Sequence, residues 1–230
     1  VHYFVFDQEA ANKYSWIDVG FVNGVNTNGG NNGITFGKTF SSAPYVFAQA
    51  QTDNDGGGAI APTSWVHSIS TTSAQLIGCD HPGTGDACAG STTEDYAYVA
   101  IDVTNANISG LSFGSQSIQN SAWTPIAYGQ TYSNPIVMVL QNSDSGGQDP
   151  EYPWVRAITS TGAEIRYCEQ DGVGDCDTHT SETVVWMSIE EGLIETNNFS
   201  KKLVSTVTDN LPFYTSLVNP QLINLNSGQS

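Results

Sequence analysis

The chain has 230 residues, of which 39% are hydrophobic and only 13% are charged, and its formal net charge is −17. A chain with so few Lys and Arg residues has no basic stripe for nucleic acids, and anionic membranes and sulfated glycans are poor electrostatic partners. No apolar run of about 18 residues occurs, so no membrane-inserted helix is predicted. A surface rich in Asn, Ser, Thr and Gly is typical of a secreted or cell-surface β-protein, whose remaining partners are neutral ligands or cations.

In chain order, the sequence predicts β-strands almost throughout. The opening run VHYFVFD is apolar and aromatic and matches the later run YAYVAID at 96–102. Further β-branched and aromatic runs, such as APYVFAQAQ, NPIVMVLQN and TVVWMSIE, are bounded by Gly, Asn, Asp and Pro. They recur at a spacing of roughly 10 residues, which is typical of an antiparallel β-sandwich. No segment has a convincing helical period.

An internal repeat organises these strands. SWVHSISTTSAQLIGC at 64–79 aligns without a gap on PWVRAITSTGAEIRYC at 153–168. APYVFAQAQTDNDGG likewise aligns on NPIVMVLQNSDSGG, and TTEDYAYVAID aligns on TSETVVWMSIE. A fourth match, SWIDVGF on AWTPIAYG, pairs Trp16 with Trp123. Agreement across four blocks indicates tandem copies of one domain.

The repeat fixes the predicted domain boundaries. We expect residues 1–10 to be the last strand of a preceding repeat, 11–104 and 105–192 to be two complete β-sandwiches, and 193–230 to be a linker followed by the front part of a further repeat. The chain would then be a segment of a longer array. The strands at its two ends would be free to pair with each other or with a neighbouring chain.

The four cysteines enclose two short Gly/Asp loops, CDHPGTGDAC from Cys79 to Cys88 and CEQDGVGDC from Cys168 to Cys176. Three pairings are possible, and the repeat favours the two local disulfides. An oxidising, extracellular compartment would allow them. Closing such a loop is worth about 2–3 kcal/mol on a chain-entropy estimate. The alternative is four free, buried thiols.

Several residues at equivalent positions of the two repeats are candidate ligand contacts. Trp65 and Trp154 could each stack on a sugar, or each could fill a sandwich core. Asp53 and Asp144 lie in the turns QTDNDGG and QNSDSGG, where a carboxylate could bind sugar hydroxyls or Ca²⁺. The alternative is that Asp and Asn suit tight turns.

Two further equivalent pairs lie on strands. His67 and Arg156 share one strand position, and Glu94 and Glu182 each begin a strand, where they could accept hydrogen bonds from a neighbouring loop. No His/Cys/Asp group has the spacing of a zinc site, so no metal is predicted.

The strand order SWIDVGF … APYVFAQAQTD … WVHSISTTSAQLIGC … YAYVAID, and its counterpart in the second repeat, resemble the H-type lectin domain of snail agglutinins and discoidin C-terminal domains. The resemblance covers nearly the whole chain. It implies a six-stranded antiparallel sandwich for each repeat. It also implies non-catalytic binding of galactose- or N-acetylgalactosamine-type sugars at one end of the sandwich, usually in trimers.

The resemblance also indicates which residues would contact a sugar. Asn26 and Asn28 lie in the loop VNGVNTNGGNNG, where the family has an acidic residue. His67 and Arg156 lie near the family's basic residue on a central strand. His81 lies in the loop after Cys79, where the family has an aromatic residue and a histidine.

The expected function is therefore an extracellular, carbohydrate-binding tandem module that favours neutral, galactose-type sugars. The alternative is a structural subunit of an extracellular filament or surface layer, assembled as a homo-oligomer or polymer through its terminal strands. No carboxylate pair and no Ser/His/Asp set stands out, so an enzyme is not predicted. No cofactor is expected, although Ca²⁺ remains open.

Overall fold

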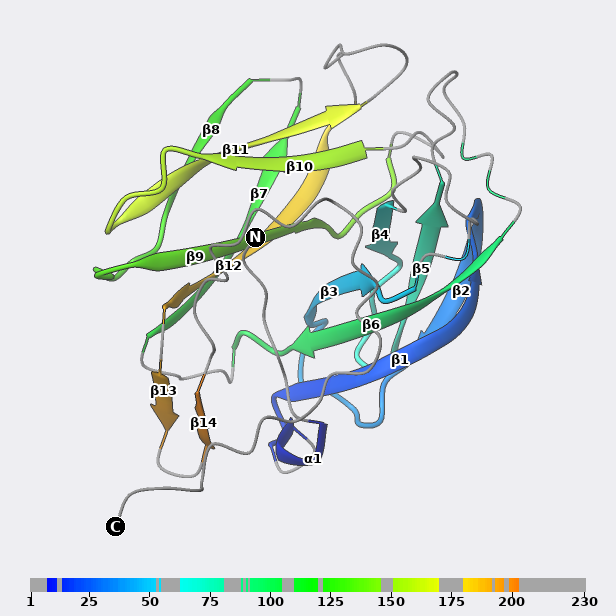
Figure 1. The fold of residues 1–230 in the computed structure, drawn as a ribbon, viewed down its shortest axis with the longest axis horizontal. Coiled ribbons are helices and arrows are strands. Elements are labelled where there is room, and N and C mark those ends of the chain that lie inside the picture. The colour runs from blue at the N-terminus through cyan, green and yellow to red at the C-terminus, as the bar shows by residue number, and fades with distance from the viewer. Residues whose placement is uncertain are drawn as a thin grey trace.

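Figure 1 shows the computed structural model of the chain, which describes residues 8–11, 14–52, 54, 63–80, 88, 90, 92–104, 110–119, 122–145, 151–169, 180–191, 193–196 and 199–202. In this part of the chain the fold is all-β, as predicted, with four three-stranded antiparallel sheets and one two-stranded hairpin. The only helix described, α1, is a single turn at Gln8–Ala11, which the sequence did not predict. Of the strand expected at residues 1–10, residues 1–7 lie outside the described residues, and the rest of that range begins helix α1 instead.

The first two sheets come from the first repeat. Their strands are β1 (Ile17–Asn26), β2 (Asn28–Thr35), β3 (Tyr45–Ala50), β4 (Thr63–His67), β5 (Ser73–Cys79) and β6 (Thr93–Ile101). The sheets have the orders β1-β6-β3 and β2-β5-β4. Alternate side chains from both sheets meet in one core, whose members are Val25, Ile34, Phe36, Phe40, Val46, Ala48, Val66, Ala74, Leu76, Tyr96, Tyr98 and Ala100.

The next two sheets repeat this pattern. Their strands are β7 (Leu111–Ile118), β8 (Thr124–Ala127), β9 (Pro135–Gln141), β10 (Glu151–Arg156), β11 (Gly162–Glu169) and β12 (Glu182–Glu190). The orders are β7-β12-β9 and β10-β11-β8. Their shared core contains Ile118, Ile126, Tyr128, Tyr132, Ala163, Ile165, Tyr167, Val184 and Trp186. Beyond them, β13 (Leu193–Thr196) and β14 (Phe199–Lys202) form a hairpin.

A third core joins the two repeats. The outer face of β1-β6-β3 packs on the outer face of β7-β12-β9, and the buried residues between them are Ala11, Ile17, Phe47, Val99, Ile101, Val185 and Met187. The sheets are thus layered in the order β2-β5-β4, β1-β6-β3, β7-β12-β9, β10-β11-β8. Figure 1 shows the first repeat at the lower right and the second at the upper left. Because β6 and β12 are covered on both faces, their sequences are almost continuously apolar instead of alternating.

One side chain links the two repeats by backbone-like hydrogen bonds. Val46 lies on β3, an edge strand. Its N–H donates to Asn142 Oδ1 at 3.0 Å, and its carbonyl accepts from Asn142 Nδ2 at 2.7 Å. The amide of Asn142 therefore occupies the place of a neighbouring strand and covers the edge at this point.

The two repeats share fine detail as well as strand order. Buried Glu94 accepts hydrogen bonds from Thr52 Oγ1 and, at 2.7 Å, from the backbone N–H of Asn54. Buried Glu182 likewise accepts from Ser143 Oγ and, at 2.7 Å, from the N–H of Ser145. The loop that each glutamate holds is the one between the third and fourth strands of its repeat.

The register corrects one block of the sequence alignment. Ile17 of β1 pairs with Ile101 of β6, and Leu111 of β7 pairs with Ile189 of β12, so β1 corresponds to β7. Trp123 immediately precedes β8, which corresponds to β2. The pairing of Trp16 with Trp123 was therefore wrong, because two short motifs with a tryptophan before an apolar run looked alike on different strands.

Candidate functional site

The structure places the predicted sugar contacts in separate regions. Trp65 is only 1% exposed and packs with Ile77, Cys79 and Cys88. A sugar cannot stack on an indole ring that is covered in this way, so the expectation of a platform at Trp65 is not supported. Its equivalent, Trp154, is 52% exposed on β10. The same repeat position is thus covered in one copy and open in the other.

His67 and Asp144 come from different repeats and meet at their junction. His67 Nε2 hydrogen-bonds to Asn31 Oδ1 at 2.8 Å. Partial burial raises the pKa of Asp144, whereas the nearby His67 and the Trp65 indole lower it and Glu182 raises it further. Trp65 Nε1 has no hydrogen-bond partner, so its contact with Asp144 is looser than a hydrogen bond. These groups interact with one another at the seam between the repeats.

The remaining predicted contacts do not join this group. Asn26 Oδ1 accepts the N–H of Asn28 at 3.2 Å, and Asn28 Oδ1 accepts the N–H of Gly30 at 3.1 Å, so both amides stabilise the turn between β1 and β2. Asp53 and His81 lie outside the described residues.

The first predicted disulfide, Cys79–Cys88, is confirmed. Cys168 is also disulfide-bonded, and Cys176 lies outside the described residues.

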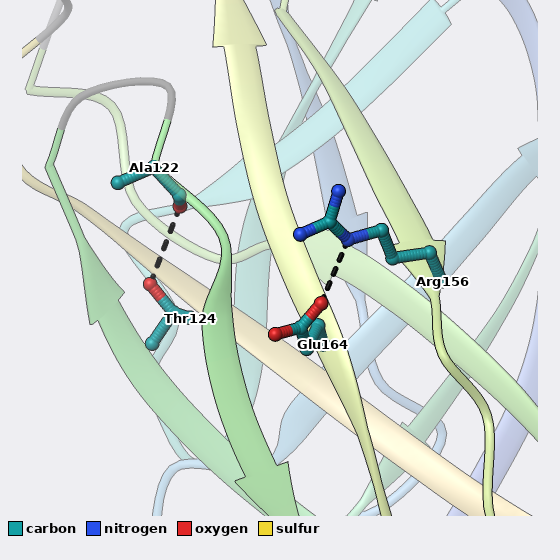
Figure 2. Close-up of polar contacts among 4 residues, drawn as sticks. All are labelled: Ala122, Thr124, Arg156 and Glu164. Atoms are coloured by element: carbon teal, nitrogen blue, oxygen red, sulfur yellow. Dashed lines mark hydrogen bonds and ion pairs between the residues drawn. The ribbon is translucent and has the colours of Figure 1, made fainter.

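An aromatic and cationic surface lies on the outer face of β10-β11-β8. In the register of this sheet Trp154 faces Arg166, and Arg156 faces Glu164. Figure 2 shows Arg156 reaching from β10 to Glu164 on β11, with Nε 2.7 Å from Oε2. This is the one ion pair between side chains found in the described part of the chain. The surface holds both arginines of a chain that has only six basic Lys and Arg residues.

Trp123, the residue just before β8, completes this surface on the other side of β11. The Cζ atoms of Arg156 and Arg166 lie 4.0 and 4.7 Å from the centroid of the Trp123 ring, and Arg166 Cζ lies 5.1 Å from the ring of Trp154. We call these four residues, Trp123, Trp154, Arg156 and Arg166, the Trp–Arg ladder. Each cation–π contact is worth about 0.5–1 kcal/mol at an exposed site. Together these contacts favour the observed arrangement of the four side chains.

The local backbone explains how Trp123 is presented. It lies just before β8, between Ala122 and Thr124, and Thr124 Oγ1 donates to the Ala122 carbonyl at 3.4 Å (Figure 2). Within β11, inward Ile165 and Tyr167 alternate with Glu164 and Arg166, as expected for a strand with one face buried and one exposed. The sequence interpretation identified Trp154 and Arg156 but not Trp123, Glu164 or Arg166.

A groove elsewhere on the molecule was not predicted from the sequence. A groove of about 740 Å³ runs beside β1 and α1, with Asp18, Lys38 and Tyr98 among its lining residues. Asp18 Oδ2 accepts from the Tyr98 hydroxyl at 3.0 Å. Burial lowers the pKa of Lys38, and Asp18 partly opposes that shift. Phe21, 60% exposed, lies at the groove. Asp18 is buried, and Lys38 Nζ donates to the carbonyls of Ala11 and Tyr14 at 3.3 and 2.6 Å, so the two charged groups of the groove are occupied by contacts within the protein.

Within the described residues, no three His, Cys, Asp or Glu side chains are grouped closely enough to hold a metal ion. In the same part of the chain, no helix has the length and apolar character needed to cross a membrane.

Comparison with known proteins gives no relatives. No protein-family model matches the chain, and neither a curated protein nor a solved structure is significantly similar to it.

Proposed function

We propose that this chain is a secreted, non-catalytic carbohydrate-binding module made of two tandem H-type-lectin-like β-sandwiches, and that galactose-type sugars bind at the Trp–Arg ladder. The observation that carries the proposal is the 52% exposed indole of Trp154, next to two arginines on the same sheet face. Large aromatic side chains are normally buried, so one held open beside polar groups suggests a binding surface. The Cys79–Cys88 disulfide is compatible with an oxidising, extracellular location.

The chemistry of the ladder suits a pyranose. The apolar C–H face of the sugar would stack on the exposed face of Trp154, as aromatic surfaces favour. Arginine side chains supply N–H donors, and Glu164 supplies an acceptor, for the hydroxyl groups around the ring. A galactose-type ring is favoured by the family resemblance alone.

Binding of glycans by the wild-type chain and by two variants tests the proposal. A glycan array identifies the ligand, and calorimetry then measures its affinity. We expect Trp154→Ala to weaken binding by roughly tenfold or more, because it removes the stacking surface. Phe21→Ala is the matched control, since it removes another exposed aromatic ring (60% exposed) from the first repeat and should leave the affinity unchanged. A blank array from folded protein, or equal affinity of Trp154→Ala and wild type, would contradict the proposal.

A structural subunit of a filament or surface layer is the second candidate. The observation that favours it is the buried apolar core between the two repeats, since the same kind of face-to-face packing would extend an array of such domains. A blank array together with polymers visible by electron microscopy would support this function over carbohydrate binding.

A further inference from the structure

We propose that the Trp–Arg ladder prefers acidic members of the galactose-type sugars, with the sugar ring on Trp154 and its anionic group on the guanidinium of Arg166. This inference rests on the proposed function and specifies its ligand. It also departs from the expectation of neutral sugars, which came from the net charge of −17. The total charge of a chain does not determine the charge of one sheet face.

The two arginines of the ladder differ in their partners. Arg156 is paired with Glu164. The guanidinium of Arg166 makes contacts with the rings of Trp123 and Trp154, and within the described residues this side chain makes no ion pair and its Nε has no hydrogen-bond partner. Among the described members of this surface, Glu164 balances the charge of Arg156, and no carboxylate is paired with Arg166. In a chain with 23 acidic residues and six basic ones, a guanidinium that no described carboxylate pairs with is a candidate site for an anionic ligand.

The position of Arg166 suits recognition of an anion. Its guanidinium lies between two indole rings, with Cζ 4.7 and 5.1 Å from their centroids, so little side-chain entropy is lost when a ligand binds. Its Nε is buried and has no hydrogen-bond partner, whereas the residue as a whole is partly exposed. Terminal guanidinium nitrogens bind carboxylate or sulfate oxygens through paired, charge-assisted hydrogen bonds.

The negative charge elsewhere on the chain does not cancel this local attraction. At physiological ionic strength charges separated by more than about 8 Å are largely screened. A carboxylate in direct contact with Arg166 therefore interacts mainly with that guanidinium. The surrounding charge should slow the approach of a long acidic polymer more than it weakens the contact once formed.

Calorimetry with matched oligosaccharides tests the inference. Oligomers of galactose and of galacturonic acid share ring stereochemistry and differ at C6, and galactose 6-sulfate shows whether a carboxylate or any anion suffices. We expect galacturonate oligomers to bind the wild-type chain roughly tenfold more tightly than galactose oligomers, because a hydrogen bond to a charged group is the stronger kind. Tighter binding of the 6-sulfate than of galactose would also support recognition of the anion.

Arginine variants assign the effect to one side chain. Arg166→Gln should abolish the preference, so that this variant binds galacturonate and galactose oligomers with equal affinity, and Arg166→Lys should retain part of the preference because it keeps the charge. Arg156→Gln is the matched control, because this arginine is already paired with Glu164, and it should preserve the preference. Near-ultraviolet circular dichroism confirms that the indoles keep their environment.

The possible outcomes separate this inference from the proposed function. Equal affinity for the neutral and acidic oligomers, or equal loss in Arg156→Gln and Arg166→Gln, would overturn the acidic preference and leave sugar binding intact. Absence of binding to every sugar would overturn the proposed function itself.

Discussion

The most direct test of how the two repeats are joined is the substitution Asn142→Ala. This change removes the side-chain amide that accepts from the N–H of Val46 at 3.0 Å and donates to its carbonyl at 2.7 Å. Val46 has no exposed surface, so water cannot easily replace the lost partners. Each hydrogen bond of this kind contributes about 0.5–1.5 kcal/mol net. We therefore expect the free energy of unfolding to fall by about 1–3 kcal/mol.

The first repeat supplies a matched control. Gln51 occupies the position equivalent to Asn142, since its backbone N–H bonds Asp95 just as that of Asn142 bonds Thr183, each at 2.7 Å. The Gln51 side chain is exposed and contacts only carbonyls of its own strand end, at 3.2 and 3.3 Å. Gln51→Ala should therefore change stability by less than about 0.5 kcal/mol.

Two measurements compare Asn142→Ala with Gln51→Ala. Urea unfolding followed by tryptophan fluorescence gives the change in free energy for both variants. Amide hydrogen exchange reports on Val46 directly, and its N–H should exchange roughly tenfold faster or more in Asn142→Ala, in proportion to the stability lost. If Asn142→Ala is as stable as Gln51→Ala and the Val46 amide stays equally protected, the side chain does not link the repeats as we argue.

Two other predictions concern buried groups. The Tyr128 hydroxyl has no hydrogen-bond partner, and burial, assisted by Tyr132, raises its pKa to about 12. An unfolded tyrosine ionises near pH 10, so the contribution of the neutral Tyr128 to the free energy of unfolding should be complete below that pH and be lost between about pH 10 and 12. In urea unfolding, Tyr128→Phe should reduce this loss and raise the free energy of unfolding by about 1 kcal/mol at pH 7. An alkaline decline that is the same in the variant and the wild type would contradict this role of Tyr128. Replacing both Cys79 and Cys88 by Ala should lower the free energy of unfolding by about 2–3 kcal/mol. It should also shift tryptophan emission to the red, because Trp65 becomes hydrated. A loss of stability with unchanged emission would show that the disulfide does not cover Trp65.

Much of the fold was predictable because it depends on local patterns. Short β-branched runs between turn residues indicated strands, and the aligned cysteines indicated the Cys79–Cys88 disulfide, which the structure contains. The packing of one repeat on the other was not predicted, although the signal was present. The runs YAYVAI and TVVWMSI in the sixth strand of each repeat lack alternation, and a strand without alternation is buried on both faces.

The candidate site was harder to predict because it depends on what covers a side chain. Trp65 and Trp154 are equivalent in sequence, yet one is 1% and the other 52% exposed. The cross-strand neighbour of Trp65 is Ile77, and that of Trp154 is Arg166. An apolar neighbour on an outer face indicates a covered surface, and a charged neighbour indicates an open one. Comparing neighbours across strands, which requires the register, would have separated the two tryptophans.

The layered order of the sheets determines how many polymer strands the molecule could hold. The outer face of β10-β11-β8, which carries the Trp–Arg ladder, lies at one end of the stack, because the two middle sheets cover each other. The outer face of β2-β5-β4 lies at the other end, and there the indole of Trp65 is buried. A single extended glycan on the ladder cannot continue onto that opposite face. Holding one polymer at two points would then require a second copy of the ladder, in another molecule or in another pair of repeats.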